Sequence, residues 1–233
     1  MNIRNHKVIS CHYLFTIIII GLSLCCGISP VHAGNSLEEV VNRLEKRYDE
    51  IKDIRADFVQ KTTIEGFEKE IVSNGILYIK KPERMRWDYR KEVKQQIYIN
   101  DDVLWLYQPE QGQAIKSRLN ARVESLIPFY LLTDIKRLRE EFDIEFEEKK
   151  AEKKRGVYRL RLHPKDQQMI VSKVIIEIAD EDFFIHKISI FEKSGNSSFF
   201  DFTMIRYNTG LNDEIFLFKI PEGIEVIEQP FIE

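Results

Sequence analysis

Cysteine is confined to the start of this chain, and its absence elsewhere limits how the protein can be stabilised. Cys11, Cys25 and Cys26 are the only cysteines, so no disulfide can form within residues 34–233. Without disulfides, this part of the chain must be stabilised by its hydrophobic core. Residues 34–233 are long enough to form one well-buried domain.

Histidine and the common catalytic motifs are also scarce. After residue 33 the only histidines are His163 and His186, and there is no H-x-x-x-H spacing, G-x-S-x-G turn or phosphate loop. Two separate histidines without a cysteine do not make a structural zinc or metalloprotease site. A Ser-His-Asp triad stays open from sequence, because its members meet only in space. We expect no enzymatic activity, no catalytic residue, no metal and no cofactor.

An excess of basic residues is missing as well. The formal net charge of the whole chain is −3 at pH 7, and the first 33 residues contain basic but no acidic side chains. The remaining domain is therefore more acidic than the whole chain. Since nucleic-acid binding needs a basic surface, we expect no nucleic-acid partner.

The first 33 residues have the pattern of an export signal. Arg4 and Lys7 precede an apolar run, and Val31-His32-Ala33 fits the small-residue rule for cleavage. We predict cleavage after Ala33 and a single domain over residues 34–233.

Two alternatives concern the same segment. Residues 13–31 are almost long enough to span a membrane, so an uncleaved anchor stays open. Residues 22–25 resemble a lipoprotein cleavage box, but bulky Leu24 precedes Cys25 where a small residue is needed. Lipidation at Cys25 is therefore disfavoured.

The chain does contain many short segments in which apolar residues alternate with polar ones. Around Pro82, which marks a turn because it cannot donate to a strand ladder, Leu77 and Ile79 precede the turn and Met85 and Trp87 follow it. Polar or charged residues separate most of the apolar ones. This period of two predicts an antiparallel hairpin with one apolar and one charged face.

The alternation continues beyond this hairpin. Ile97 and Ile99 repeat it, so we expect them to face a common cavity with the four apolar residues around Pro82. Strands this closely spaced favour antiparallel hairpins over crossovers. The predicted strands are residues 56–60, 73–80, 84–90, 95–100, 103–107, 142–149, 157–162, 173–178, 184–191, 199–207 and 214–220, and the segment after 223.

Two segments have helical spacing instead. Residues 36–52 predict an amphipathic helix with an N-terminal capping box. Residues 121–138 predict a helix broken near Pro128, and this segment, with Phe129 and Leu132, is more apolar than a surface helix requires. Periodicity does not separate a buried plug from a lid over an apolar cavity, so both interpretations stay open.

Five segments together carry a family resemblance: Ala56-Asp-Phe-Val-Gln-Lys61, Gly75 to Tyr89, Leu104-Trp-Leu-Tyr107 with Pro109, Pro128-Phe129, and Phe218-Lys-Ile-Pro-Glu-Gly-Ile-Glu-Val226. Each segment alone is a weak motif. Their order and spacing, with the export signal, resemble the periplasmic outer-membrane lipoprotein carrier proteins, the LolA family. The resemblance runs through essentially all of residues 34–233.

The resemblance implies an α+β fold, in which a strongly curved antiparallel sheet forms an unclosed barrel and helices cover its concave apolar face. It implies a monomeric periplasmic carrier that takes acylated lipoproteins from an inner-membrane ABC-type extraction complex and delivers them to an outer-membrane lipoprotein acceptor. An acyl chain in water costs about 0.8 kcal/mol per CH₂, so such a carrier needs a substitute apolar pocket. We expect the acyl cavity to be formed by Leu77, Ile79, Met85, Trp87, Ile97, Ile99, Phe129 and Leu132.

Two residues differ from the pattern common in the family. Lys81 stands where the family commonly has an arginine that holds the lid shut through backbone contacts, so lysine keeps the charge but loses the planar fork of donors. Lys81 is therefore our candidate for lid closure, by donation to the backbone carbonyls of residues 128–132. Met85 stands where familiar members have an aromatic residue, and its flexibility suits variable acyl chains. Ordinary divergence explains both differences equally well.

Other functions stay possible on the same fold. A carrier of other lipids, such as glycolipids, would share the fold and the polarity of the pocket. A lipid-sensing regulatory domain is a second alternative, although regulators resembling this fold normally carry a further domain. An extracytoplasmic hydrolase is the least supported.

Overall fold

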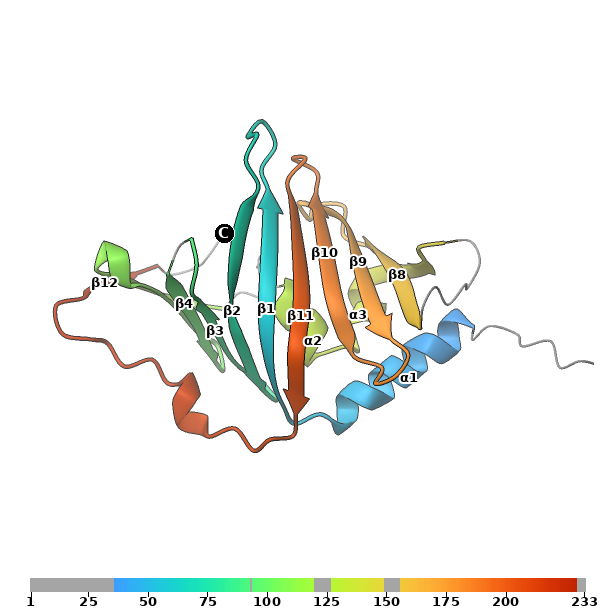
Figure 1. Ribbon diagram of the computed structural model, residues 1–233, viewed down its shortest axis with the longest axis horizontal. Helices are drawn as coiled ribbons and strands as arrows, with labels where there is room; N and C mark the ends of the chain where they lie inside the picture. The colour runs from blue at the N-terminus through green and yellow to red at the C-terminus, as the bar shows by residue number, and fades with distance from the viewer. Residues whose placement is uncertain (1–35, 93, 120–126, 149–155, 230–233) are drawn as a thin grey trace, which may run out of the picture. The chain divides into compact units, whose positions relative to one another are not determined.

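The alternating segments pair into one sheet of twelve strands in the computed structural model, which describes residues 36–92, 94–119, 127–148 and 156–229. The order across the sheet is β12-β6-β5-β4-β3-β2-β1-β11-β10-β9-β8-β7, so β1 and β11 lie side by side at its centre (Figure 1). The strands are β1 (Asp53–Thr63), β2 (Ile71–Lys80), β3 (Arg84–Tyr89), β4 (Gln95–Asn100), β5 (Val103–Gln108), β6 (Gln113–Arg118), β7 (Phe142–Phe146), β8 (Val157–Pro164), β9 (Val171–Ala179), β10 (Ile185–Glu192), β11 (Ser197–Tyr207) and β12 (Glu225–Glu228).

The register of β2 to β5 confirms the predicted alternation. Two rows of apolar residues cross these strands on one face of the sheet. The first row is Leu77, Trp87, Ile97 and Leu106, and the second is Ile79, Met85, Ile99 and Leu104. Residues between them, such as Arg86 and Tyr98, lie on the opposite face. Because side chains alternate between the faces of a strand, all six predicted strand residues share the apolar face.

Two expectations about the C-terminal part are wrong. Residues 214–220 do not form a strand, since a 3₁₀ helix η3 (Asp213–Phe216) replaces its first half. The carboxylate of Asp213 pairs with Lys80 and with Arg84, the latter at 2.7 Å, and Phe218 packs between aromatic rings of β4 and β5. These contacts hold the segment across the sheet instead of within it. After this crossing, β12 pairs with β6 in parallel, so the sheet is not wholly antiparallel.

Three α-helices accompany the sheet in the part of the chain that the structure describes. α1 (Leu37–Glu50) has the expected capping box, in which Ser36 and Glu39 bond each other's backbone N–H groups. The predicted second helix is two short helices, α2 (Ile127–Thr133) and α3 (Arg137–Glu141); residues 121–126 lie outside the described part. α2 and α3 are seen behind the sheet in Figure 1.

The helices and the apolar face of the sheet form one buried cluster. It joins Leu44 and Tyr48 of α1 and Leu131 of α2 with strand residues from β1 to β11. Arg139 of α3 adds polar contacts to α1, with its guanidinium bonded to Glu38, Asn42 and Glu45. The helices therefore cover one face of an unclosed, curved sheet, as expected. No helix in the described ranges is long and apolar enough to cross a membrane.

A buried carboxylate ties the two central strands together where β1 begins and β11 ends. Asp53 is only 3% exposed and accepts hydrogen bonds from the backbone N–H and hydroxyl of Thr209 and the backbone N–H of Gly210, at 2.8–2.9 Å. Burial by itself would raise the pKa of Asp53, but these donors outweigh it and hold the pKa below its usual value.

Candidate functional site

An apolar cavity of about 410 Å³ lies against the predicted face of the sheet. It is bordered by strands from both halves of the sheet and by α2, so residues far apart in sequence meet around it. The lining residues are Gln60, Met85, Trp87, Tyr89, Ile97, Leu104, Leu106, Pro128, Ile170, Val171, Ile190, Glu192, Ser198 and Phe200.

The eight residues expected around an acyl cavity fall into three groups. Met85, Trp87 and Ile97 border the cavity. Leu77, Ile79, Ile99 and Leu132 do not border it; they are at most 1% exposed and belong to the packed core beside it. Phe129 belongs to α2, but its side chain lies outside the described part of the structure.

Sequence reasoning missed more than half of the cavity lining. Leu104 and Leu106 carry a usable signal, because they continue the same alternation in β5. Phe200 also recurs with Phe202 at a spacing of two residues in β11, which places both on one face. By contrast, nothing in the local pattern distinguishes Gln60 or Glu192 from any other polar residue at a strand end.

Aromatic rings form one wall of the cavity. The ring centroid of Trp87 lies 5.9 Å from that of Tyr89, in a stacked arrangement, and 5.5 Å from that of Phe200. Phe58 contacts both Trp87 and Tyr89 edge-on. The indole nitrogen of Trp87 is buried and has no hydrogen-bond partner among the described residues. Burial raises the pKa of the Tyr89 hydroxyl, which therefore stays a neutral donor.

A chain of hydrogen bonds continues from this wall. The Tyr89 hydroxyl donates to the amide oxygen of Gln60 at 2.8 Å, and the Gln60 amide nitrogen donates to Thr62 at 3.1 Å. The Thr62 hydroxyl lies 3.3 Å from that of Ser198 on the neighbouring strand. The cavity is thus apolar over most of its wall and polar where these strands approach their hairpins.

Lys81 lies at the turn between β2 and β3 and contacts α1. Its ammonium donates to the backbone carbonyl of Tyr48, in the last turn of that helix. The expected acceptors were carbonyls of residues 128–132, so the bond that the structure describes goes to a different helix. Burial lowers the pKa of Lys81, while the charges of Asp49 and Asp134 oppose this shift. Asp134 directly follows α2, so the ammonium is influenced by the ends of both helices.

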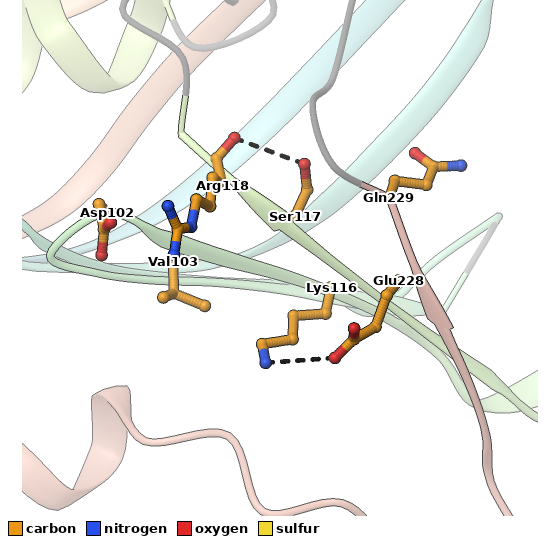
Figure 2. Close-up of a pocket in the computed structure, with 7 residues that line it drawn as sticks. All are labelled: Asp102, Val103, Lys116, Ser117, Arg118, Glu228 and Gln229. Atoms are coloured by element: carbon orange, nitrogen blue, oxygen red, sulfur yellow. Dashed lines mark hydrogen bonds and ion pairs between the residues drawn. The ribbon is translucent and has the colours of Figure 1, made fainter.

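A second, more open hollow of about 580 Å³ lies at the edge of the sheet where β12 pairs with β6. Figure 2 shows Lys116 and Glu228 pointing toward one another across it, with 3.4 Å between their charged atoms. Arg118, Asp102 and Gln229 also line it. This lining is too polar for an acyl chain, so we place the candidate site at the smaller apolar cavity.

A curved sheet with an apolar cavity under its covering helices suits a carrier of an apolar ligand. The family model of the outer membrane lipoprotein carrier protein LolA matches residues 49–219. The chain belongs to this family of lipoprotein carriers.

Individual relatives agree with this assignment. An outer-membrane lipoprotein carrier protein of Methylococcus capsulatus is 28% identical over 187 residues, which cover 80% of this chain and 86% of that protein. The outer-membrane lipoprotein carrier protein of Histophilus somni is 28% identical over 206 residues, covering 88% of this chain and 94% of the relative. The fold is shared with an uncharacterised conserved protein of Thermus thermophilus, with a TM-score of 0.52 and 14% identity, covering 84% of this chain and all of that one.

Proposed function

We propose that this protein is a periplasmic carrier that holds the acyl chains of lipoproteins in the apolar cavity and moves them from the inner to the outer membrane. The single observation that carries the proposal is the apolar cavity of about 410 Å³ in a chain of the LolA family. Its volume lies within the range of about 300–1,000 Å³ that is usual for small-ligand pockets. Relatives named as outer-membrane lipoprotein carriers support lipoproteins as the cargo.

The physical task of such a carrier explains why it needs no catalytic group. Each methylene moved from water into an apolar site contributes about 0.8 kcal/mol, so every methylene held in the cavity offsets that much of the cost of extracting an acyl chain from a bilayer. The carrier would receive its cargo from an inner-membrane ABC-type extraction complex and release it to an outer-membrane lipoprotein acceptor. The export signal would be cleaved after Ala33 on export, and the intact mass of the exported protein would test this.

Lys81 is our candidate for controlling access to the cavity. Its bond to the carbonyl of Tyr48 places a cation at the C-terminal end of α1, where the helix dipole is negative. The negative charge of Asp134 favours the charged form of the same ammonium. Asp134 directly follows α2, and Pro128 of α2 borders the cavity. Loss of the ammonium would therefore weaken the attachment of the β2–β3 turn to the ends of α1 and α2, which we propose holds the cavity closed.

The experiment that tests the carrier function is mass spectrometry of ligand that copurifies with the exported protein. Ile97→Glu places a charge in the cavity wall, whereas Gln96→Glu places one on the opposite face of the same strand. We expect an acylated polypeptide to copurify with the wild type and with Gln96→Glu but not with Ile97→Glu. Recovery of glycolipid or phospholipid alone would favour a carrier of other lipids. Absence of any lipid from the wild type would contradict both proposals.

A further inference from the structure

The cavity differs in character between its two ends. Met85, Leu104 and Pro128 make one end apolar. At the other end, Gln60, Ser198 and Glu192 lie near the hairpins that join β1 to β2 and β10 to β11. These two hairpins project at the same end of the sheet in Figure 1. An amphiphilic ligand would therefore enter in one orientation, with its tail away from these hairpins.

Glu192 is the one charged residue among those that border the cavity in the described part of the chain. One of its carboxylate oxygens accepts from the Ser194 hydroxyl and from the Asn196 amide, at 2.8 Å each. No Lys, Arg or His nitrogen of a described residue lies within ion-pairing distance of this carboxylate. The other polar residues of this end already bond one another, through Gln60 and Ser198.

Glu192 is a half-buried carboxylate beside an apolar cavity, and it has no cationic partner among the described residues. Such a group favours a ligand that carries a positive charge. The N-terminal cysteine of an acylated lipoprotein carries two chains on its glyceryl group, and its α-amino group is either free or acylated. A free α-amino group has a pKa of about 7.7–8.0 and is mostly protonated near neutral pH. An acylated one is neutral and leaves Glu192 without a partner.

We propose that this end of the cavity is a head-group subsite in which Glu192 pairs with the free α-ammonium of a diacylated N-terminal cysteine. The assignment rests on the proposed carrier function and specifies its cargo. The acyl chains then extend toward Met85, Leu104 and Pro128. A charge-assisted hydrogen bond of this kind should favour the free amine over a capped one by roughly ten-fold.

The test is competition against a bound fluorescent fatty-acyl probe near neutral pH. The competitors are a dipalmitoyl-glyceryl-cysteinyl peptide with a free amine, the same peptide with an N-acetyl group, and dipalmitoyl phosphatidylethanolamine. The acetyl group removes the charge without adding a third chain. Asp201→Asn is the matched control for Glu192→Gln, because Asp201 lies on the outer face of neighbouring β11 and pairs with Lys187 at 3.7 Å.

We expect the wild type and Asp201→Asn to prefer the free-amine peptide roughly ten-fold, and Glu192→Gln to bind both peptides equally. Equal binding by the wild type, or a preference that survives in Glu192→Gln, would overturn the head-group subsite while leaving the carrier function intact. A Glu192-dependent preference for phosphatidylethanolamine instead would identify a phospholipid amine as the ligand and would also overturn the proposal. If neither peptide displaces the probe from the wild type, the carrier function fails as well.

Discussion

Replacing Leu106 by tryptophan should fill part of the apolar cavity and weaken acyl binding without unfolding the protein. Leu106 is only partly buried, borders the cavity from β5, and lies opposite Ile97 in the sheet. A larger ring at this position can therefore grow into empty space. At a fully packed neighbour such as Ile99, the same change would force its surroundings apart.

The size of the effect follows from the volume that the ring takes from the ligand. Tryptophan has about six more side-chain heavy atoms than leucine, and if about half of them enter the cavity they displace about three methylenes. At about 0.8 kcal/mol each, the loss is about 2.4 kcal/mol, or about fifty-fold in affinity. Chains shorter than the remaining cavity should lose much less.

The assay is binding of saturated acyl probes from octanoyl to palmitoyl. In the wild type, affinity should rise by about four-fold per methylene until the cavity is full, and in Leu106→Trp the rise should stop at a shorter chain. Tyr107→Trp is the matched control, since this residue lies on the opposite face of β5 beside Phe218. An unchanged chain-length profile in Leu106→Trp, or an equal loss in the control, would refute the placement of the ligand in this cavity.

Three further changes test the fold and the proposed lid. Gly75→Ala should lower the free energy of unfolding by roughly 2–3 kcal/mol and the melting temperature by roughly 5–10 °C. The reason is that the new Cβ would lie 1.8 Å from the carbonyl oxygen of Asp88, and an unchanged melting curve would contradict this contact. Asp53→Asn should destabilise the protein near neutral pH, but the difference in unfolding free energy from the wild type should shrink as pH falls below about 4, because a carboxyl with a lowered pKa stabilises only while ionised. Urea unfolding near neutral pH and below a pH of about 4 measures this difference, and a difference that does not change with pH would contradict the prediction. Lys81→Leu should slow transfer of a labelled lipoprotein to an acceptor, whereas Lys81→Arg should preserve it, because of the two only arginine can donate to the Tyr48 carbonyl. Normal transfer by a folded Lys81→Leu variant would show that Lys81 is only a turn residue.

Local sequence patterns were sufficient for much of the architecture. The alternation around Pro82 correctly assigned Leu77 and Met85 to one face, because a strand has a fixed period of two regardless of its neighbours. The capping box at Ser36 also marked the start of α1 correctly, since it involves only the first turn. The failures occurred where distant contacts override local preference, as in η3, where pairing of Asp213 with β2 and β3 holds an apolar segment outside the sheet.

The sequence by itself thus determined which residues of β2 to β4 share the apolar face, and it carries the pattern of an export signal and the resemblance to a carrier family. Only the tertiary structure decided which interior residues border empty space: Ile97 does, whereas Ile99, two positions along the same strand, is fully packed. It also brought Glu192 to the cavity and gave the Lys81 ammonium its acceptor in α1. The physical reason is that periodicity specifies the direction of a side chain, whereas a cavity depends on how strands and helices far apart in the chain fill the space between them.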